Sequence, residues 1–191
     1  SLRELHIGNE RLVSYNVEMT EVTGGTFWKA YTPAQIAGTE PFVLKGGFLG
    51  NATASTDLMQ YYDPIDISDK KLRKLAKEIG PAWVRVSGTW STKTYYDFDG
   101  HTNGVIPEGY NAILTREQWL GVLDFCKDIG AKLLISVADC EGLHHADEPW
   151  NPSQAEQIFA LSKEYGKAID AAEFVNEPNL LAMSGCPKGY T

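Results

Sequence analysis

No stretch of this 191-residue sequence approaches the length of a membrane-spanning helix. Such a helix takes about 20 apolar residues, whereas the longest apolar runs here, such as residues 132–137, have the length of a buried strand. Hydrophobic residues make up 43% of the chain and charged residues 22%, which is typical of a globular protein with one sizeable core. We therefore expect a soluble globular chain.

Positive charge is also scarce, since 17 Lys and Arg stand against 25 Asp and Glu, for a net charge of -8. Nucleic acids and anionic membranes are bound through clustered Lys and Arg, so neither is an expected partner. The one basic run, residues 70–74, has the pattern of a solvated helix face.

Cysteine is rare, and the three that occur form no CxxC pair, which argues against a zinc knuckle or a thioredoxin-like site. Cys126 has apolar neighbours and is interpreted as a small buried hydrophobe. Cys140 and Cys186 lie in loop segments, and the sequence leaves open whether they pair. The chain does not begin with a basic region and an apolar stretch, so we expect that any signal peptide was removed or never existed.

What the sequence does contain is an alternation of strand and helix patterns. Strands are expected at 14–19, 83–87, 132–137 and 172–175. Three helices are expected: one that begins at Ser68, with Ser68 or Asp66 as its cap, one that begins at the capping box 115–118, and one over 153–167. A long irregular segment reaches from the first strand to about residue 63. This order predicts right-handed crossovers and a parallel sheet.

Two folds fit that order, a doubly wound sheet and the N-terminal half of a (β/α)8 TIM barrel. No GxGxxG or GxxxxGK[ST] motif follows a strand, so the usual nucleotide-binding reason for a doubly wound sheet is missing. Polar residues collect instead where strands end, as in barrel enzymes: Glu18, Ser87, Thr89, Asp139, Glu141, Asn176 and Glu177. We predict four βα units of a barrel within residues 13–191, preceded by a segment, 1–12, that could add a strand to an accessory β-domain.

The run Asn176-Glu177-Pro178 after the last strand is the most specific chemical signal. Glycoside hydrolysis needs one carboxylic acid as proton donor and a second carboxylate as nucleophile or base. Phe174 and Val175 would desolvate Glu177 and raise its pKa, and Asn176 can donate its amide to a sugar hydroxyl beside the reacting carbon. We predict Glu177 as the proton donor, although the same run also suits a plain turn.

Residues 80–89, Gly-Pro-Ala-Trp-Val-Arg-Val-Ser-Gly-Thr, and residues 174–179 resemble segments of the (β/α)8 retaining glycosidases, and within that clan the heparanase and β-glucuronidase family, glycoside hydrolase family 79. The likeness extends over about residues 13–179. It implies that Glu177 is the acid/base, that Asn176 contacts a substrate hydroxyl, and that Glu18 and Thr89 hold the sugar. The chain departs from the family pattern at Ser87, usually a glycine, and at Glu18, where relatives can carry aspartate.

The resemblance also implies a nucleophile on a seventh strand. A complete barrel takes about 250 residues, so we expect this chain to be a fragment or processed subunit that is inactive alone. Asp139 and Glu141 stay open as substitutes, but a substrate contact is the favoured role of Asp139. The adjacent His144 and His145 lack a metal-binding spacing, so no metal or cofactor is expected.

The aromatic residues Trp90, Tyr95 and Tyr96 could stack on sugar rings or cover the core, and Trp90 is taken as a candidate substrate contact. The predicted activity is retaining hydrolysis of a β-linked oligosaccharide or polysaccharide, with a β-glucuronide as one candidate. The alternative is a non-catalytic carbohydrate-binding or interaction module. The expected partner is the missing barrel half, and the expected location is secreted or extracytoplasmic. Open strand edges predict self-association.

Overall fold

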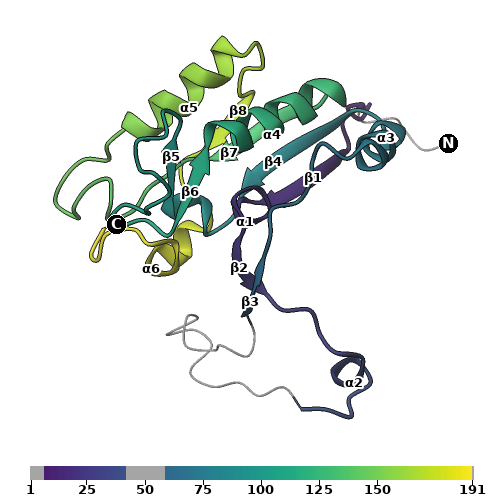
Figure 1. Ribbon diagram of the computed structural model, residues 1–191, viewed down its shortest axis with the longest axis horizontal. Coiled ribbons are helices and arrows are strands. Elements are labelled where there is room, and N and C mark those ends of the chain that lie inside the picture. Colours follow the sequence, from purple (N-terminus) through teal and green to yellow (C-terminus); the bar gives the residue numbers. More distant parts are fainter. Residues whose placement is uncertain (1–6, 42–58, 191) are drawn as a thin grey trace.

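The computed structural model describes residues 7–41 and 59–190 (Figure 1). Its centre is a parallel sheet of four strands in the order β1-β4-β7-β8. The strands are β1 (Val13–Glu18), β4 (Ala82–Ser87), β7 (Lys132–Ser136) and β8 (Ala171–Glu173). The expected α/β class and parallel sheet are confirmed.

The order of the strands in the sheet follows their order in the chain. Each strand pairs with the sheet strand that precedes it in sequence, from Val13 opposite Ala82 to Ser136 opposite Glu173. A doubly wound sheet begins in the middle and reverses direction. Within the part of the chain that the structure describes, this sheet has no such reversal.

Three helices lie between successive strands of this sheet: α3 (Lys70–Ile79), α4 (Arg116–Asp128) and α5 (Ser153–Glu164). Their inward residues form one hydrophobic core with alternate residues of the strands, and its members include Ala76, Val84, Val86, Trp119, Leu123, Leu133, Ile135, Ile158 and Leu161. Side chains of a strand alternate between its two faces. All three helices therefore share the sheet face to which Val84 and Ile135 point.

The other sheet face carries polar residues toward the carboxyl ends of its strands, although Trp83 and Leu134 also belong to it by alternation. The register pairs Asn16 with Arg85 and Ser136 with Glu173, on the strand positions that alternate with the core residues. The side chains of Arg85 and Glu173 are 30% and 31% exposed, whereas Val84 and Ile135 are 1% and 0% exposed. We call this surface the polar face of the sheet.

The helix boundaries follow from capping. Thr115 begins α4 by accepting a hydrogen bond from the Gln118 backbone, and the Gln118 side chain accepts one from the Thr115 backbone, so the predicted capping box is confirmed. The predicted start of α3 is wrong. Asp69 caps that helix through the Leu72 amide, whereas Asp66 binds the backbone and hydroxyl of Ser68.

Several short elements were not expected from the sequence. Met19 ends the first strand early because it begins α1 (Met19–Thr23). The predicted irregular segment contains α2 (Pro33–Ile36) and an antiparallel ribbon of β2 (Gly25–Trp28) and β3 (Met59–Tyr62), which projects from the sheet in Figure 1. Residues 42–58 of that segment lie outside the described residues. A parallel pair, β5 (Thr94–Asp97) and β6 (Ala112–Thr115), and α6 (Leu181–Ser184) complete the fold.

The N-terminal segment, over its described residues 7–12, forms no strand. The accessory strand expected within 1–12 is therefore not formed by those residues, and 1–6 lie outside the described part. Arg11 ties the segment to the sheet, since its guanidinium donates to the carbonyls of Ala82 at 3.1 Å and Gly130 at 2.9 Å. None of the helices in the described ranges is long and apolar enough to cross a membrane.

Candidate functional site

The carboxyl ends of the four sheet strands meet at one edge because the strands are parallel. Glu18 ends β1 directly opposite Ser87, which ends β4. Ser136 ends β7 opposite Glu173, which ends β8. The sheet therefore brings polar side chains from all four strands to one place, and the Asn176-Glu177 pair lies three and four residues after the last strand residue, Glu173.

Glu177 has an unusual backbone conformation. Its φ of 52° and ψ of 65° are left-handed, and among the described residues Asn103 is the only other non-glycine residue with positive φ. This conformation is uncommon for a glutamate and is typical of strained functional positions. The Glu177 carboxylate accepts long hydrogen bonds of 3.5 Å from the Thr89 hydroxyl and the Asn176 amide.

The surroundings of Glu177 differ from the expectation. Strand β8 ends at Glu173 because its pairing with β7 stops there, so the predicted strand to residue 175 is wrong at its end. The chain leaves the sheet before Glu177, whose side chain is exposed, and Phe174 is 44% exposed. The expectation that Phe174 and Val175 bury Glu177 is therefore wrong.

Glu18, the last residue of β1, lies beside β4 and is half-buried. Burial, followed by the negative charges of Glu21 and Glu177, raises the pKa of Glu18, and the Arg85 charge opposes that rise. The Glu18 carboxylate packs directly on Gly88, where a Cβ atom would stand 1.7 Å from its Oε2 atom. Gly88 also has φ of 98°, so both the space and the backbone at this position require glycine.

The carboxylate of Glu173, at the end of β8, forms an ion pair and hydrogen bonds with its neighbours. Arg85 makes an ion pair with it, and hydroxyls from Ser87, at 3.1 Å, and Ser136 donate to the same Oε1 atom. Sequence reasoning missed both Arg85 and Glu173 as site residues. The alternation of side chains along a strand could have identified Arg85, because it places Arg85 on the same strand face as Ser87. Glu173 lies on that face because the register places it opposite Ser136.

Asp139 is not brought together with the other predicted site residues. Its side chain is fully buried and accepts a hydrogen bond of 2.7 Å from the ring of His144, which is itself 4% exposed. The Cys186 thiol donates to the Asp139 backbone carbonyl at 3.3 Å. Cys140 and Cys186 are both free thiols, and burial raises their pKa to about 11 and about 12.

The predicted aromatic residues have different surroundings. Trp90, which follows Thr89, makes an edge contact with Phe27 of the β2–β3 ribbon at 5.3 Å between ring centroids. Tyr96 is fully buried, so its predicted alternative of covering the core is confirmed. Tyr95 packs against Tyr110 and bonds to His101 at 3.1 Å. Trp90 is therefore the one of the three that adjoins the strand ends through Thr89.

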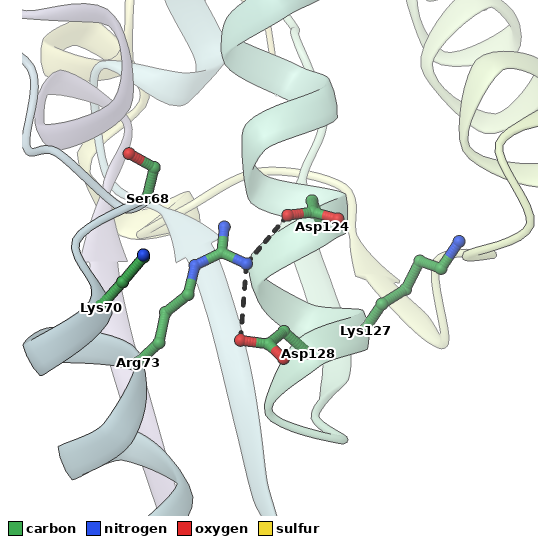
Figure 2. A pocket seen from close by; sticks show the side chains of 6 residues that line it. All are labelled: Ser68, Lys70, Arg73, Asp124, Lys127 and Asp128. Carbon is green, nitrogen blue, oxygen red and sulfur yellow. Dashed lines mark hydrogen bonds and ion pairs between the residues drawn. The ribbon is translucent and has the colours of Figure 1, made fainter.

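The other charged clusters lie elsewhere. Asp97, Asp99 and His101 are the only group in the described ranges whose donor atoms are close enough to share a metal ion, and two of them are exposed. Figure 2 shows a surface groove between α3 and α4, in which Arg73 pairs with Asp124 at 2.8 Å and Asp128 at 3.5 Å. Its two aspartates pair with Arg73, and it is formed by the helices and not by the strand ends.

Comparison with protein-family models gives no match to this chain, and comparison with curated proteins gives none either. The assignment of the site therefore depends on its geometry and on the sequence motifs that it contains.

Proposed function

We propose that this chain provides the acid/base half of a retaining glycosidase site, with Glu177 as the proton donor. The four βα units are then one half of a (β/α)8 barrel. Two observations favour this barrel over a doubly wound sheet: the strands follow chain order, and α3, α4 and α5 share one face. Within the described residues, β1 and β8 each pair on one side only, which leaves the edges where further strands would close a barrel.

The observation that carries the proposal is the left-handed conformation of Glu177 beside Asn176 and Thr89. A carboxyl group held this way at the carboxyl ends of parallel strands faces the position where barrel enzymes bind substrate. The nearby Glu18 and Asn176 supply an acceptor and a donor for sugar hydroxyls. Trp90 adds an aromatic surface on which a sugar ring can stack.

The chemistry assigned to Glu177 has two steps. As a carboxylic acid it gives its proton to the glycosidic oxygen while a second carboxylate attacks the anomeric carbon, which breaks the bond to the leaving group. As a carboxylate it then takes a proton from water, and the oxygen of that water displaces the second carboxylate from the sugar. Retaining enzymes hold these two carboxyl groups about 5–5.5 Å apart. We assign the second carboxylate to a strand outside this chain.

Rates on aryl β-glycosides, glucuronide included, test the proposal. The full-length protein that contains this chain is compared with its Glu177→Gln variant, on leaving groups of high and low pKa. We expect a loss of about 10²–10⁴-fold on poor leaving groups and a smaller loss on good ones, since only a poor leaving group needs the proton. The matched control is Glu156→Gln, an exposed glutamate of α5.

Three outcomes separate the possibilities. Activity of the full-length protein with none in the 191-residue chain supports the half-site assignment. Equal losses on good and poor leaving groups would show that Glu177 is not the acid. A full-length protein that binds oligosaccharides but cleaves none of the glycosides would show instead a carbohydrate-binding module.

A further inference from the structure

A hydrogen-bonded network crosses the polar face of the sheet beneath Glu177, and Arg85 is at its centre. The Arg85 guanidinium donates to Asn16 of β1 at 2.6 Å and to Glu173 of β8, with which it forms an ion pair. It also donates from Nη2 to Oδ1 of Asn176 at 2.9 Å. One side chain thus connects the first strand, the last strand and the residue that precedes Glu177.

The Arg85 contact determines which end of the Asn176 amide faces Glu177. A side-chain amide has one accepting end and one donating end. Its Oδ1 atom lies 2.9 Å from the Arg85 donor and 3.4 Å from the Ser87 hydroxyl. Its Nδ2 atom therefore points away from these donors and lies 3.5 Å from the Glu177 carboxylate.

We infer that Arg85 is a positioning residue, held in place by Glu173, that orients the Asn176 amide so that its NH2 group meets the sugar hydroxyl beside the reacting carbon. This inference rests on the proposed function, because it deepens the role of Asn176 in the same site. It also explains the strand-end carboxylate Glu173, whose charge is matched by Arg85. Glu173 is a support for Arg85 and not a second acid.

Orienting the Asn176 amide requires the planar, multiple N–H donors of the Arg85 guanidinium. Its N–H groups lie in one plane and reach three acceptors in fixed directions, Asn16, Glu173 and Asn176. A lysine at position 85 keeps the charge but donates from a single nitrogen on a flexible stem. Arg85→Lys should therefore preserve the fold and release the amide of Asn176.

The first test follows Asn176 directly in the 191-residue chain by NMR, with no dependence on catalysis. Three-bond couplings to the Asn176 Cγ atom report whether its χ1 angle occupies one rotamer or averages over several, and nuclear Overhauser contacts of its Nδ2 protons report which end of the amide faces Glu177. We expect a single rotamer in the unmodified chain and averaged couplings in Arg85→Lys and in Glu173→Gln. Arg73→Lys, which alters an arginine with two ion pairs between α3 and α4, is the matched control and should leave the couplings unchanged.

The second test combines the same variants with substrates in the full-length protein. On a glycoside with its 2-hydroxyl group, Arg85→Lys should lower kcat by about 10–100-fold with little change in KM, because the amide contact strengthens in the transition state. On the matching 2-deoxy glycoside the loss should be within about 3-fold, since the group that Asn176 would meet is already absent. A merely structural role would lower kcat equally on both substrates.

The two tests distinguish the failure of this inference from that of the proposed function. Unchanged couplings in both Arg85→Lys and Glu173→Gln, or equal losses on the two substrates, would overturn the positioning role even in an active glycosidase. A full-length protein that is inert on every glycoside would overturn the proposed function and the role in substrate contact together. Averaged couplings in the Arg85→Lys and Glu173→Gln variants of the 191-residue chain would then show that Arg85 orients Asn176 for a ligand other than a glycoside.

Discussion

The two faces of the parallel sheet differ in what their residues do. On the helix-covered face Val84, Leu133 and Ile135 are almost completely buried and belong to the hydrophobic core. On the polar face Arg85 and Glu173 remain partly exposed and are satisfied by each other and by hydroxyls. The comparison shows that strand alternation separates the residues that stabilise this fold from the residues proposed to carry its chemistry.

The largest effect on stability should come from the helix-covered face. Trp119 of α4 is 0% exposed, and its indole donates to the Ser162 hydroxyl at 2.9 Å. Trp119→Ala removes this packing and should cost about 3–5 kcal/mol in urea unfolding. Glu177→Gln, at an exposed position, should change the free energy of unfolding by less than about 0.5 kcal/mol. Equal costs for the two variants would contradict the division between the faces.

A smaller effect is expected at Gly88, where the strand end meets Glu18. Gly88→Ala places a methyl group against the Glu18 carboxylate and imposes a disfavoured φ, so it should cost about 1–3 kcal/mol. Glu18 must also move, so the full-length protein should lose activity. Gly130→Ala, also at positive φ but with open space around it, is the control. It should lower stability without lowering activity.

The conformation of Glu177 predicts a gain in stability and a loss of function in the same variant. Glu177→Gly removes the strain of a left-handed glutamate, and part of the gain is offset by the greater freedom of glycine in the unfolded chain. We expect a net stabilisation of about 0.5–1 kcal/mol and a severe loss of activity. Thermal unfolding at equal protein concentration measures the first, and a decrease in melting temperature would argue against strain at this residue.

The smallest effect is a pH dependence at Glu18. Its pKa is raised in the folded chain, so the folded state binds more protons than the unfolded state between the ordinary value of 4.5 and the raised value. Stability contributed by this group therefore falls as pH rises through that window. Glu18→Gln should gain stability relative to the unmodified chain between pH 4 and pH 7. Urea unfolding at both values checks this, and a constant difference would refute it.

The sequence predicted the elements whose signals are local. The capping box at Thr115 and Gln118 specifies where α4 begins, because the hydrogen bonds join residues in the same turn. The alternation of strands and helices likewise predicted the parallel sheet. The β2–β3 ribbon was missed because its two strands pair across a long separation, from Gly25 opposite Tyr62.

The site was predicted less completely than the sheet. Glu177 and Thr89 were selected by motif and do lie within reach of each other. Arg85 and Glu173 were missed, because a contact between residues so far apart in sequence depends on the strand register. The exposure of Glu177 was also not predictable, since it depends on where β8 stops pairing with β7.

The chain-order arrangement of the sheet has a consequence for protein synthesis. As the ribosome releases the chain from its N-terminus, each new strand finds the strand that it pairs with already made. Strand β4 can dock on β1, β7 on β4 and β8 on β7. The helix that precedes each of these strands has by then been synthesised and can pack on the sheet. The network around Arg85 is completed only when β8 arrives, so the proposed site would be ordered on the ribosome only after the whole sheet has formed.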